Sequence, residues 1–157
     1  MCRFRYFTGV AAALSAVAVA GCDPGYTYTP VDANGQPVSE WATTIAGVKF
    51  SVTPSSILIG SSNEFIGLDV VNGSAAEVVV VGAEIETNGR ALKANLFAGA
   101  ENTAARTVDA GQTGPVSLLV ELGGPAGETF GLTITYVWHI RIGSDEHTLR
   151  VPMNRQR

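Results

Sequence analysis

Large apolar side chains recur at every second position from Leu132 to Ile142, and this alternation limits the possible folds more than any other feature of the chain. In a β-strand, successive side chains point to opposite faces, so a period of two is typical of a strand buried on one face. The same period recurs in segments 48–52, 66–70 and 116–122, whereas no segment after residue 21 has the helical period of 3.6. The sequence therefore predicts an all-β fold.

Three further segments, 78–85, 92–96 and 149–153, are rich in β-branched and other apolar residues. Clusters of Gly, Ser, Pro and Asn separate all of these segments, as expected between strands. We expect seven strands in total, with one short turn of helix in segment 98–105.

Asn88-Gly89 is a strong signal for a two-residue type I′ hairpin turn. The turn predicts an apolar face made of the pairs Ile85–Leu92, Ala83–Ala94 and Val81–Leu96. On the opposite face it places Glu84 beside Lys93, an attractive pair across two strands. A shift of one residue would mix the two faces, so the turn and the apolar pattern support the same register.

A second hairpin is predicted with its turn at residues 143–146. Its apolar face pairs Ile142 with His147, Ile140 with Leu149, Trp138 with Val151 and Tyr136 with Met153. This register places His139 on the polar face, opposite Arg150. Pro152 lacks a backbone donor, which favours an edge position for the last strand.

Seven strands in about 110 residues predict a β-sandwich. The run 52–56 with Ile59-Gly60, the segment 70–72, and the loop 110–112 before Val116 resemble parts of fibronectin-III and other immunoglobulin-like modules. The resemblance spans residues 47–153 and implies an immunoglobulin-like sandwich. The cysteines and the tyrosine corner of antibody domains are not evident, so no named family is assigned.

The first residues have the layout of a secretory leader. Arg3 and Arg5 precede a short apolar run, 10–20, which ends in small residues and is followed by Cys22. This pattern resembles the lipobox of bacterial lipoproteins. The resemblance implies cleavage before Cys22, attachment of diacylglycerol to its thiol and acylation of the freed amine. The apolar run is shorter than the roughly 20 residues that a membrane-spanning helix needs.

The chain is therefore expected to comprise a cleaved leader (1–21), a lipidated N-terminus with a tether (22–45) and the sandwich domain (46–157). A turn at Asn34-Gly35 and the aromatic Tyr26, Tyr28 and Trp41 favour partial docking of the tether on the domain. We expect the protein in the cell envelope, on the periplasmic face. By resemblance to enterobacterial lipoproteins, an aspartate after the lipidated cysteine (here Asp23) favours retention at the inner membrane.

Charge and cysteine content exclude several classes of function. The whole chain has a net charge of −4, and loss of Arg3 and Arg5 with the leader would leave eight basic and fourteen acidic residues. This acidic balance, without a basic cluster, argues against nucleic acid as a partner. The only cysteines are Cys2 and Cys22, so the mature domain would have no free thiol for a disulfide, a metal site or a nucleophile.

No residue pattern indicates catalysis or a cofactor. His139 and His147 are predicted to face opposite ways, and Glu84 and Glu86 share a face on which Lys93 offsets Glu84. Asp145-Glu146 in a turn could contribute to a calcium site, but a solvated turn is the simpler interpretation. Asn72-Gly73-Ser74 matches a glycosylation sequon, which we interpret as a turn because the leader is bacterial. The glycine-rich segment 123–127 has no following lysine and is interpreted as a loop.

The sequence thus predicts a non-enzymatic lipoprotein that contacts another envelope protein through strand edges or loops, held to the membrane lipid by Cys22. The alternative is a carbohydrate- or calcium-binding module on the same tether, with Tyr26, Tyr28 and Trp41 as stacking residues. Trp138 is excluded from that role because the alternation places it inside. A second alternative is an enzyme on an unfamiliar β-scaffold that uses His139.

Overall fold

The computed structural model describes residues 25–58, 63–98, 101–103, 106–121 and 130–156, and all of their regular structure is β-strand. The predicted all-β class is therefore confirmed. The twelve strands are β1 (Gly25–Pro30), β2 (Trp41–Ile45), β3 (Val48–Val52), β4 (Ser55–Leu58), β5 (Asn63–Asn72), β6 (Val78–Thr87), β7 (Arg90–Ala98), β8 (Glu101–Thr103), β9 (Arg106–Val108), β10 (Thr113–Glu121), β11 (Thr133–Ile142) and β12 (Asp145–Arg155).

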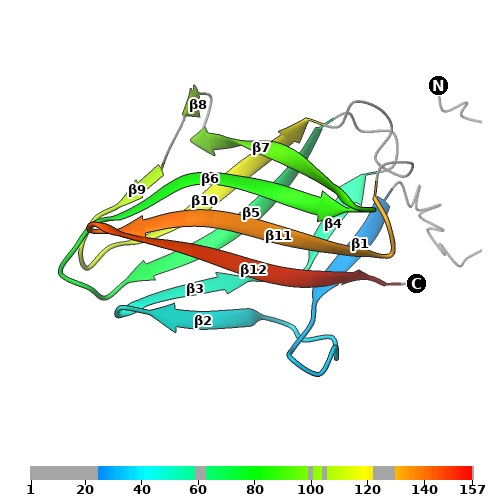
Figure 1. The fold of residues 1–157 in the computed structure, drawn as a ribbon, viewed down its shortest axis with the longest axis horizontal. Coiled ribbons are helices and arrows are strands. Elements are labelled where there is room, and N and C mark those ends of the chain that lie inside the picture. The colour runs from blue at the N-terminus through cyan, green and yellow to red at the C-terminus, as the bar shows by residue number, and fades with distance from the viewer. Residues whose placement is uncertain (1–24, 59–62, 99–100, 104–105, 122–129, 157) are drawn as a thin grey trace, which may run out of the picture.

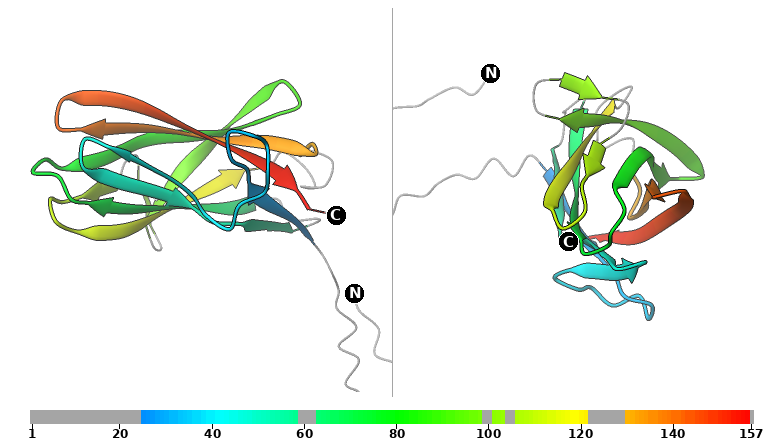
Figure 2. Two further views of the ribbon diagram at one scale, coloured as in Figure 1. Left: turned by 90° about the horizontal axis from the view of Figure 1, so that it is seen from below. Right: turned by 90° about the vertical axis from the view of Figure 1, so that its left-hand side faces the viewer.

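The strands form two packed layers (Figures 1 and 2). One layer is built on β6, β11 and β12, and the other on β3, β5 and β10. The strands follow the hydrogen-bonded order β2-β3-β5-β10-β7-β6-β11-β12-β1-β4, in which every pair is antiparallel. Short strands β8 and β9 pair with β7 and β6. This arrangement is a β-sandwich.

Strand β7 joins the two layers. Its first half pairs with β6, from Thr87↔Arg90 to Ala83↔Ala94, and its second half pairs with β10, from Val120↔Ala94 to Ser117↔Phe97. A strand that changes partner midway turns the corner of a sandwich. The hydrogen-bonded strand order therefore passes from one layer to the other through β7.

The core lies between the layers and follows the predicted alternation. On β11, the side chains of Ile134, Tyr136, Trp138, Ile140 and Ile142 are all buried. They pack with apolar side chains of the other layer and of β12. Burial of each large apolar side chain contributes about 1.5–3 kcal/mol, so this strand is central to stability. The core residues of the other layer include Val48, Phe50, Leu68, Val70 and Val116, and those of β12 include Leu149, Val151 and Met153.

The predicted β6–β7 hairpin is confirmed near its turn. Asn88 and Gly89 have φ of 48° and 74°, as a type I′ turn requires, and the pairs Glu84–Lys93 and Ile85–Leu92 form as expected. The expected pair Val81–Leu96 does not form. The β6–β11 register shifts between His139 and Ile140, so Val81 is an extra residue in a β-bulge and its side chain is 41% exposed.

The β11–β12 hairpin has a tighter turn than predicted. Ile142 pairs with Asp145, and Gly143, with φ of 59°, opens a two-residue turn of the type II′ class. The register therefore differs from the predicted one by two residues, and Trp138 lies opposite Leu149. Since side chains alternate with period two, this shift leaves every side chain on its predicted face.

Residues 25–45 differ most from the expectation, because they form strands where a tether was predicted. Strand β1 lies between β12 and β4, and the ring of Tyr28 is 0% exposed. Strand β2 pairs with β3 through a two-residue turn. The predicted turn at Asn34-Gly35, between β1 and β2, is present. Gly35 has φ of 76°, and the Asn34 backbone N–H donates to Asp32 Oδ1 at 2.8 Å. Burial of Tyr28 and Val31 attaches this segment to the core.

Strand β12 is an edge over only part of its length. Its residues 153–155 pair with β1, whereas residues 145–151 have β11 as their single strand partner in the described chain. Pro152 lies where this pairing ends: its carbonyl accepts from Val31 N at 3.0 Å, but it has no N–H to return. The short helical turn expected in 98–105 is also wrong for 101–103, which form β8 and pair with β7.

Candidate functional site

Cys22, the predicted site of lipid attachment, and Asp23, which favours the inner membrane, lie outside the described residues, as does the glycine-rich segment 123–127. Gly25, the first residue of β1, lies opposite Leu58 at one end of the sandwich. We call this the proximal end; it also holds the β6–β7 turn, the start of β11 and the C-terminus (Figure 1). The opposite, distal end carries the turns 46–47, 73–77, 109–112 and 143–144.

Side-chain hydrogen bonds fasten β1 to the proximal end. The Tyr28 hydroxyl donates to the Gly131 carbonyl at 2.6 Å, and Gly131 N donates to Thr87 Oγ1 at 3.0 Å. The Tyr28 ring also meets the edge of Phe130, with ring centroids 6.3 Å apart. Burial raises the pKa of Tyr28, opposed in part by the charge of Arg155, so the hydroxyl stays protonated.

A cation and an aromatic ring meet beside this cluster. The Arg155 guanidinium lies 4.2 Å from the ring centroid of Tyr26, a cation–π contact. Arg155 N donates to the Leu132 carbonyl, and Gln156 N to the Thr27 carbonyl, both at 2.8 Å. The Leu132 side chain next to them is 64% exposed, the most exposed large apolar side chain in the described residues.

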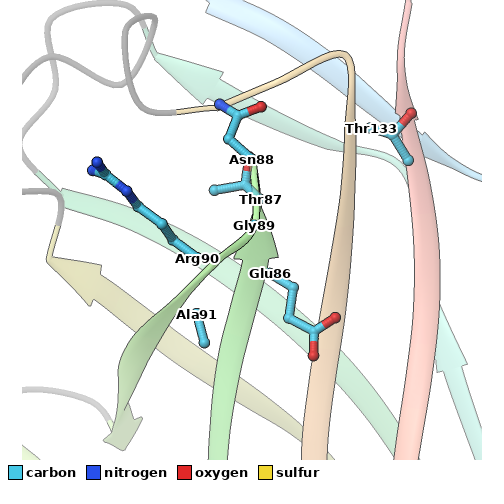
Figure 3. A pocket seen from close by; sticks show the side chains of 7 residues that line it. All are labelled: Glu86, Thr87, Asn88, Gly89, Arg90, Ala91 and Thr133. Carbon is cyan, nitrogen blue, oxygen red and sulfur yellow. The ribbon is translucent and has the colours of Figure 1, made fainter.

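A surface hollow of about 390 Å³ lies beside the β6–β7 turn. Two of its polar groups are already engaged: the Glu86 carboxylate is paired with the Arg150 guanidinium, and the Thr87 hydroxyl accepts from Gly131 N. Figure 3 shows the Arg90 side chain pointing away from Glu86. The hollow therefore lacks an activated nucleophile with its base. It is lined by Glu86, Thr87, Asn88, Gly89, Arg90, Ala91 and Thr133.

The two histidines do not come together. His139 is exposed on the outer face of β11, opposite Thr148, and not opposite Arg150 as predicted. Arg150 lies opposite Val137 instead, because of the two-residue change in register. His147 has the inward parity of β12, and its Nε2 is buried without a hydrogen-bond partner in the described residues. Opposite faces prevent the pair from sharing a ligand or a proton.

The candidate carboxylates have separate partners. Glu84 lies opposite Lys93, and Glu86 pairs with Arg150, whose pKa is raised chiefly by that hydrogen bond. Asp145 and Glu146 are exposed after the β11–β12 turn, and Ser144 Oγ donates to Asp145 Oδ1 at 3.3 Å. No group of three His, Cys, Asp or Glu side chains within the described ranges is placed to hold a metal ion.

Asn72 of the sequon is a structural residue of the distal end. Its side chain is 1% exposed; Nδ2 donates to the Ala76 and Val108 carbonyls at 2.8 and 3.0 Å, and Oδ1 accepts from Ser74 N and Oγ. The next residue, Gly73, packs closely against the 46–47 turn, because a Cβ at this position would lie 2.9 Å from the Gly47 carbonyl oxygen. The Asn72 side chain therefore joins the 73–77 turn to the end of β9, in agreement with the turn interpretation.

The aromatic residues expected to stack on a sugar are engaged with the protein. Tyr28 is fully buried, Trp41 is half-buried against the core, and Tyr26 lies under Arg155. Trp138 is fully buried, as predicted, but its Nε1 has no hydrogen-bond partner among the described residues, a feature that sequence alternation does not reveal.

Comparison with known proteins adds little. No protein-family model and no curated protein matches the chain. Among solved structures, it is similar to a crystal structure of a protein from Archaeoglobus fulgidus, with a TM-score of 0.36 and 16% identity over 77% of this chain and 93% of that one. A similarity of this level carries no argument about function. In the described part of the chain, no helix is long and apolar enough to span a bilayer.

Proposed function

We propose that this protein is a non-enzymatic, lipid-anchored protein of the bacterial cell envelope that contacts another protein through a strand edge. The carrying observation is the lipobox-like Val19-Ala20-Gly21-Cys22 placed directly before a folded β-sandwich. The lipid would be attached through Cys22, on the periplasmic side, and Asp23 favours the inner membrane.

We further propose that the sandwich is immunoglobulin-like. In that fold, strands A, B and E share one sheet, strands C, F and G share the other, and the chain order is A, B, C, E, F, G. Strands β3, β5 and β10 are neighbours in one layer, and β6, β11 and β12 are neighbours in the other, in the matching chain order. Strand β7 takes the place of the strand that crosses between sheets. Strands β1, β2 and β4 are additions to this frame.

Strand β2 is the edge best suited to pair with another protein. It ends the strand order and pairs only with β3 among the described strands. Natural edges are usually protected by charged residues, prolines or bulges. The sequence of β2, Trp-Ala-Thr-Thr-Ile, contains none of these. The edge of β12, in contrast, carries Asp145, Glu146 and Arg150.

The register of β2 shows which backbone groups are available. The residues that flank a two-residue turn exchange both ladder hydrogen bonds, and such pairs then alternate along the hairpin. Ile45–Val48 and Thr43–Phe50 are therefore bonded pairs. Thr44 lies between these pairs and Ala42 follows the second one, so both direct N–H and C=O away from β3, and both are exposed. A partner strand would add at these groups by β-augmentation.

Intact mass of the membrane-extracted protein tests the anchor. We expect a chain that begins at Cys22 and carries acyl groups, and we expect Cys22→Ala to leave the protein out of the membrane fraction. A water-soluble wild-type product that retains residues 1–21 would contradict the proposal.

Photo-crosslinking in intact cells tests the edge. A photoreactive side chain at Ala42 is expected to yield a protein crosslink, whereas one at Thr148 on the charged edge of β12 is not. Thr44→Pro removes an outward donor without touching the β2–β3 ladder, so it should abolish the crosslink, while Thr44→Val should preserve it. Equal crosslinking in both variants would exclude strand addition at β2.

A further inference from the structure

We infer that the proximal end of the sandwich rests on the membrane that carries the anchor, with Leu132 at the lipid interface. This inference depends on the proposed lipidation of Cys22. Chain length limits the distance between the lipidated residue and the domain. Cys22 is separated from Gly25, the first residue of β1, by Asp23 and Pro24 alone. Three residues of fully extended chain reach about 10 Å. The lipidated residue and the folded domain are therefore within one headgroup layer of each other.

The short reach determines which surface meets the lipid. Gly25 pairs with Leu58, and two residues further on Thr27 accepts from Gln156 N, so the start of β1, the end of β4 and the C-terminus share one end. Arg155 N in turn donates to the Leu132 carbonyl, which places Leu132 beside them. The distal turns lie a full strand length away, about 33 Å for the ten residues of β11.

The chemistry of the proximal end suits an interface between water and lipid. Leu132 is 64% exposed, more than Val71 at 44% and Val81 at 41%, the other exposed large apolar side chains among the described residues. Tyr26 and Arg155 stack beside it, and both combine an apolar body with a polar end. Such side chains are favoured at the level of lipid headgroups, where the guanidinium can approach phosphate. The acidic balance of the domain supplies no attraction of its own, so the contact depends on the anchor.

The test uses the acylated protein in vesicles of phosphatidylethanolamine and phosphatidylglycerol that contain a spin-labelled lipid. Because the Cys22 thiol is acylated, a cysteine introduced elsewhere is the single site for a fluorophore. We expect strong quenching of a label at Leu132→Cys and several-fold weaker quenching of a label at Ser144→Cys in the distal turn. Equal quenching at both positions would overturn the inference.

A second measurement separates contact by Leu132 from mere proximity. With the label at Gln156→Cys, Leu132→Ser should reduce quenching, whereas Val71→Ser, which removes a 44% exposed apolar side chain on β5, should not. No effect of Leu132→Ser would exclude Leu132 as the contact. Intact mass of the same samples distinguishes the two hypotheses: an unacylated chain refutes the anchor, and an acylated chain without selective quenching refutes only the orientation.

Discussion

Ala46 is held in a left-handed backbone conformation, with φ of 48°, in the turn between β2 and β3. A Cβ in this conformation costs about 1–2 kcal/mol, so Ala46→Gly should raise the free energy of unfolding by about 1 kcal/mol. Gly47→Ala is the matched control: its φ is 82°, and a Cβ there meets nothing closer than 3.7 Å, so the cost should be conformational alone and of opposite sign. Urea unfolding of both variants measures the difference, and a destabilised Ala46→Gly would contradict it.

Tyr28 makes stability depend on alkaline pH. Its folded-state pKa is raised above the ordinary value of 10.0, so its contribution is present below that value and is lost as pH rises through the folded pKa. Tyr28→Phe keeps the ring contact with Phe130 but loses the hydrogen bond to Gly131, which should cost about 1 kcal/mol at neutral pH. The difference in the free energy of unfolding between wild type and Tyr28→Phe should shrink as the pH rises above the ordinary pKa of tyrosine. The midpoints of urea unfolding of both proteins, measured across the alkaline pH range, test this expectation. A difference in stability that does not change with pH would contradict it.

At the level of single elements, regular alternation made strands predictable and irregular backbone did not. Strand β11 and the Asn88-Gly89 hairpin follow from period and turn chemistry. Strand β2 was missed because its turn, Ala46-Gly47, lacks the Asn or Asp that normally marks a left-handed position. The bulge at Val81 was missed because an inserted residue reverses the faces without a distinctive sequence.

The same distinction applies to the candidate site. The opposed faces of His139 and His147 were predictable, since a register error of two residues preserves faces. The proximal cluster was not, because Tyr28, Gly131 and Thr87 are remote in sequence and meet only through tertiary packing. The aromatic content of residues 26–41 was the available signal, and it indicated docking without indicating strands.

On the outer face of β6, β11 and β12, we expect Arg150 to shield the Val137 side chain from solvent in addition to forming an ion pair. Val137 lies between Glu84 and Arg150 in register and is buried, although it faces outward. The ion pair with Glu86 is exposed, so solvent screens it and its contribution to stability should be small. Arg150→Met keeps an apolar stem over Val137 and should be nearly neutral, whereas Arg150→Ala should cost more by exposing it. Thermal unfolding compares them; equal loss in both would assign the effect to charge.

At the scale of the whole molecule, β1 belongs to the folded domain although it directly follows the proposed anchor. It connects β12 to β4 and buries Tyr28 in the common core. A chain that begins at Gly25 should therefore be as stable as the full mature domain. A chain that begins at Ser39 retains β2 but loses β1, and removal of a buried aromatic residue alone costs about 3–5 kcal/mol. Since single domains are stable by about 5–15 kcal/mol, the shorter chain should be largely unfolded or marginal.

Circular dichroism and urea unfolding of the two chains measure this difference. Asp32→Ala in the chain that begins at Gly25 is the control, because it alters the loop between β1 and β2 without removing either strand. If the chain beginning at Ser39 were as stable as the longer one, β1 would be a docked tether and the anchor could lie many residues from the domain. A marked loss of stability would instead mean that the folded body begins three residues after the lipid, which limits its movement to the immediate surface of the membrane.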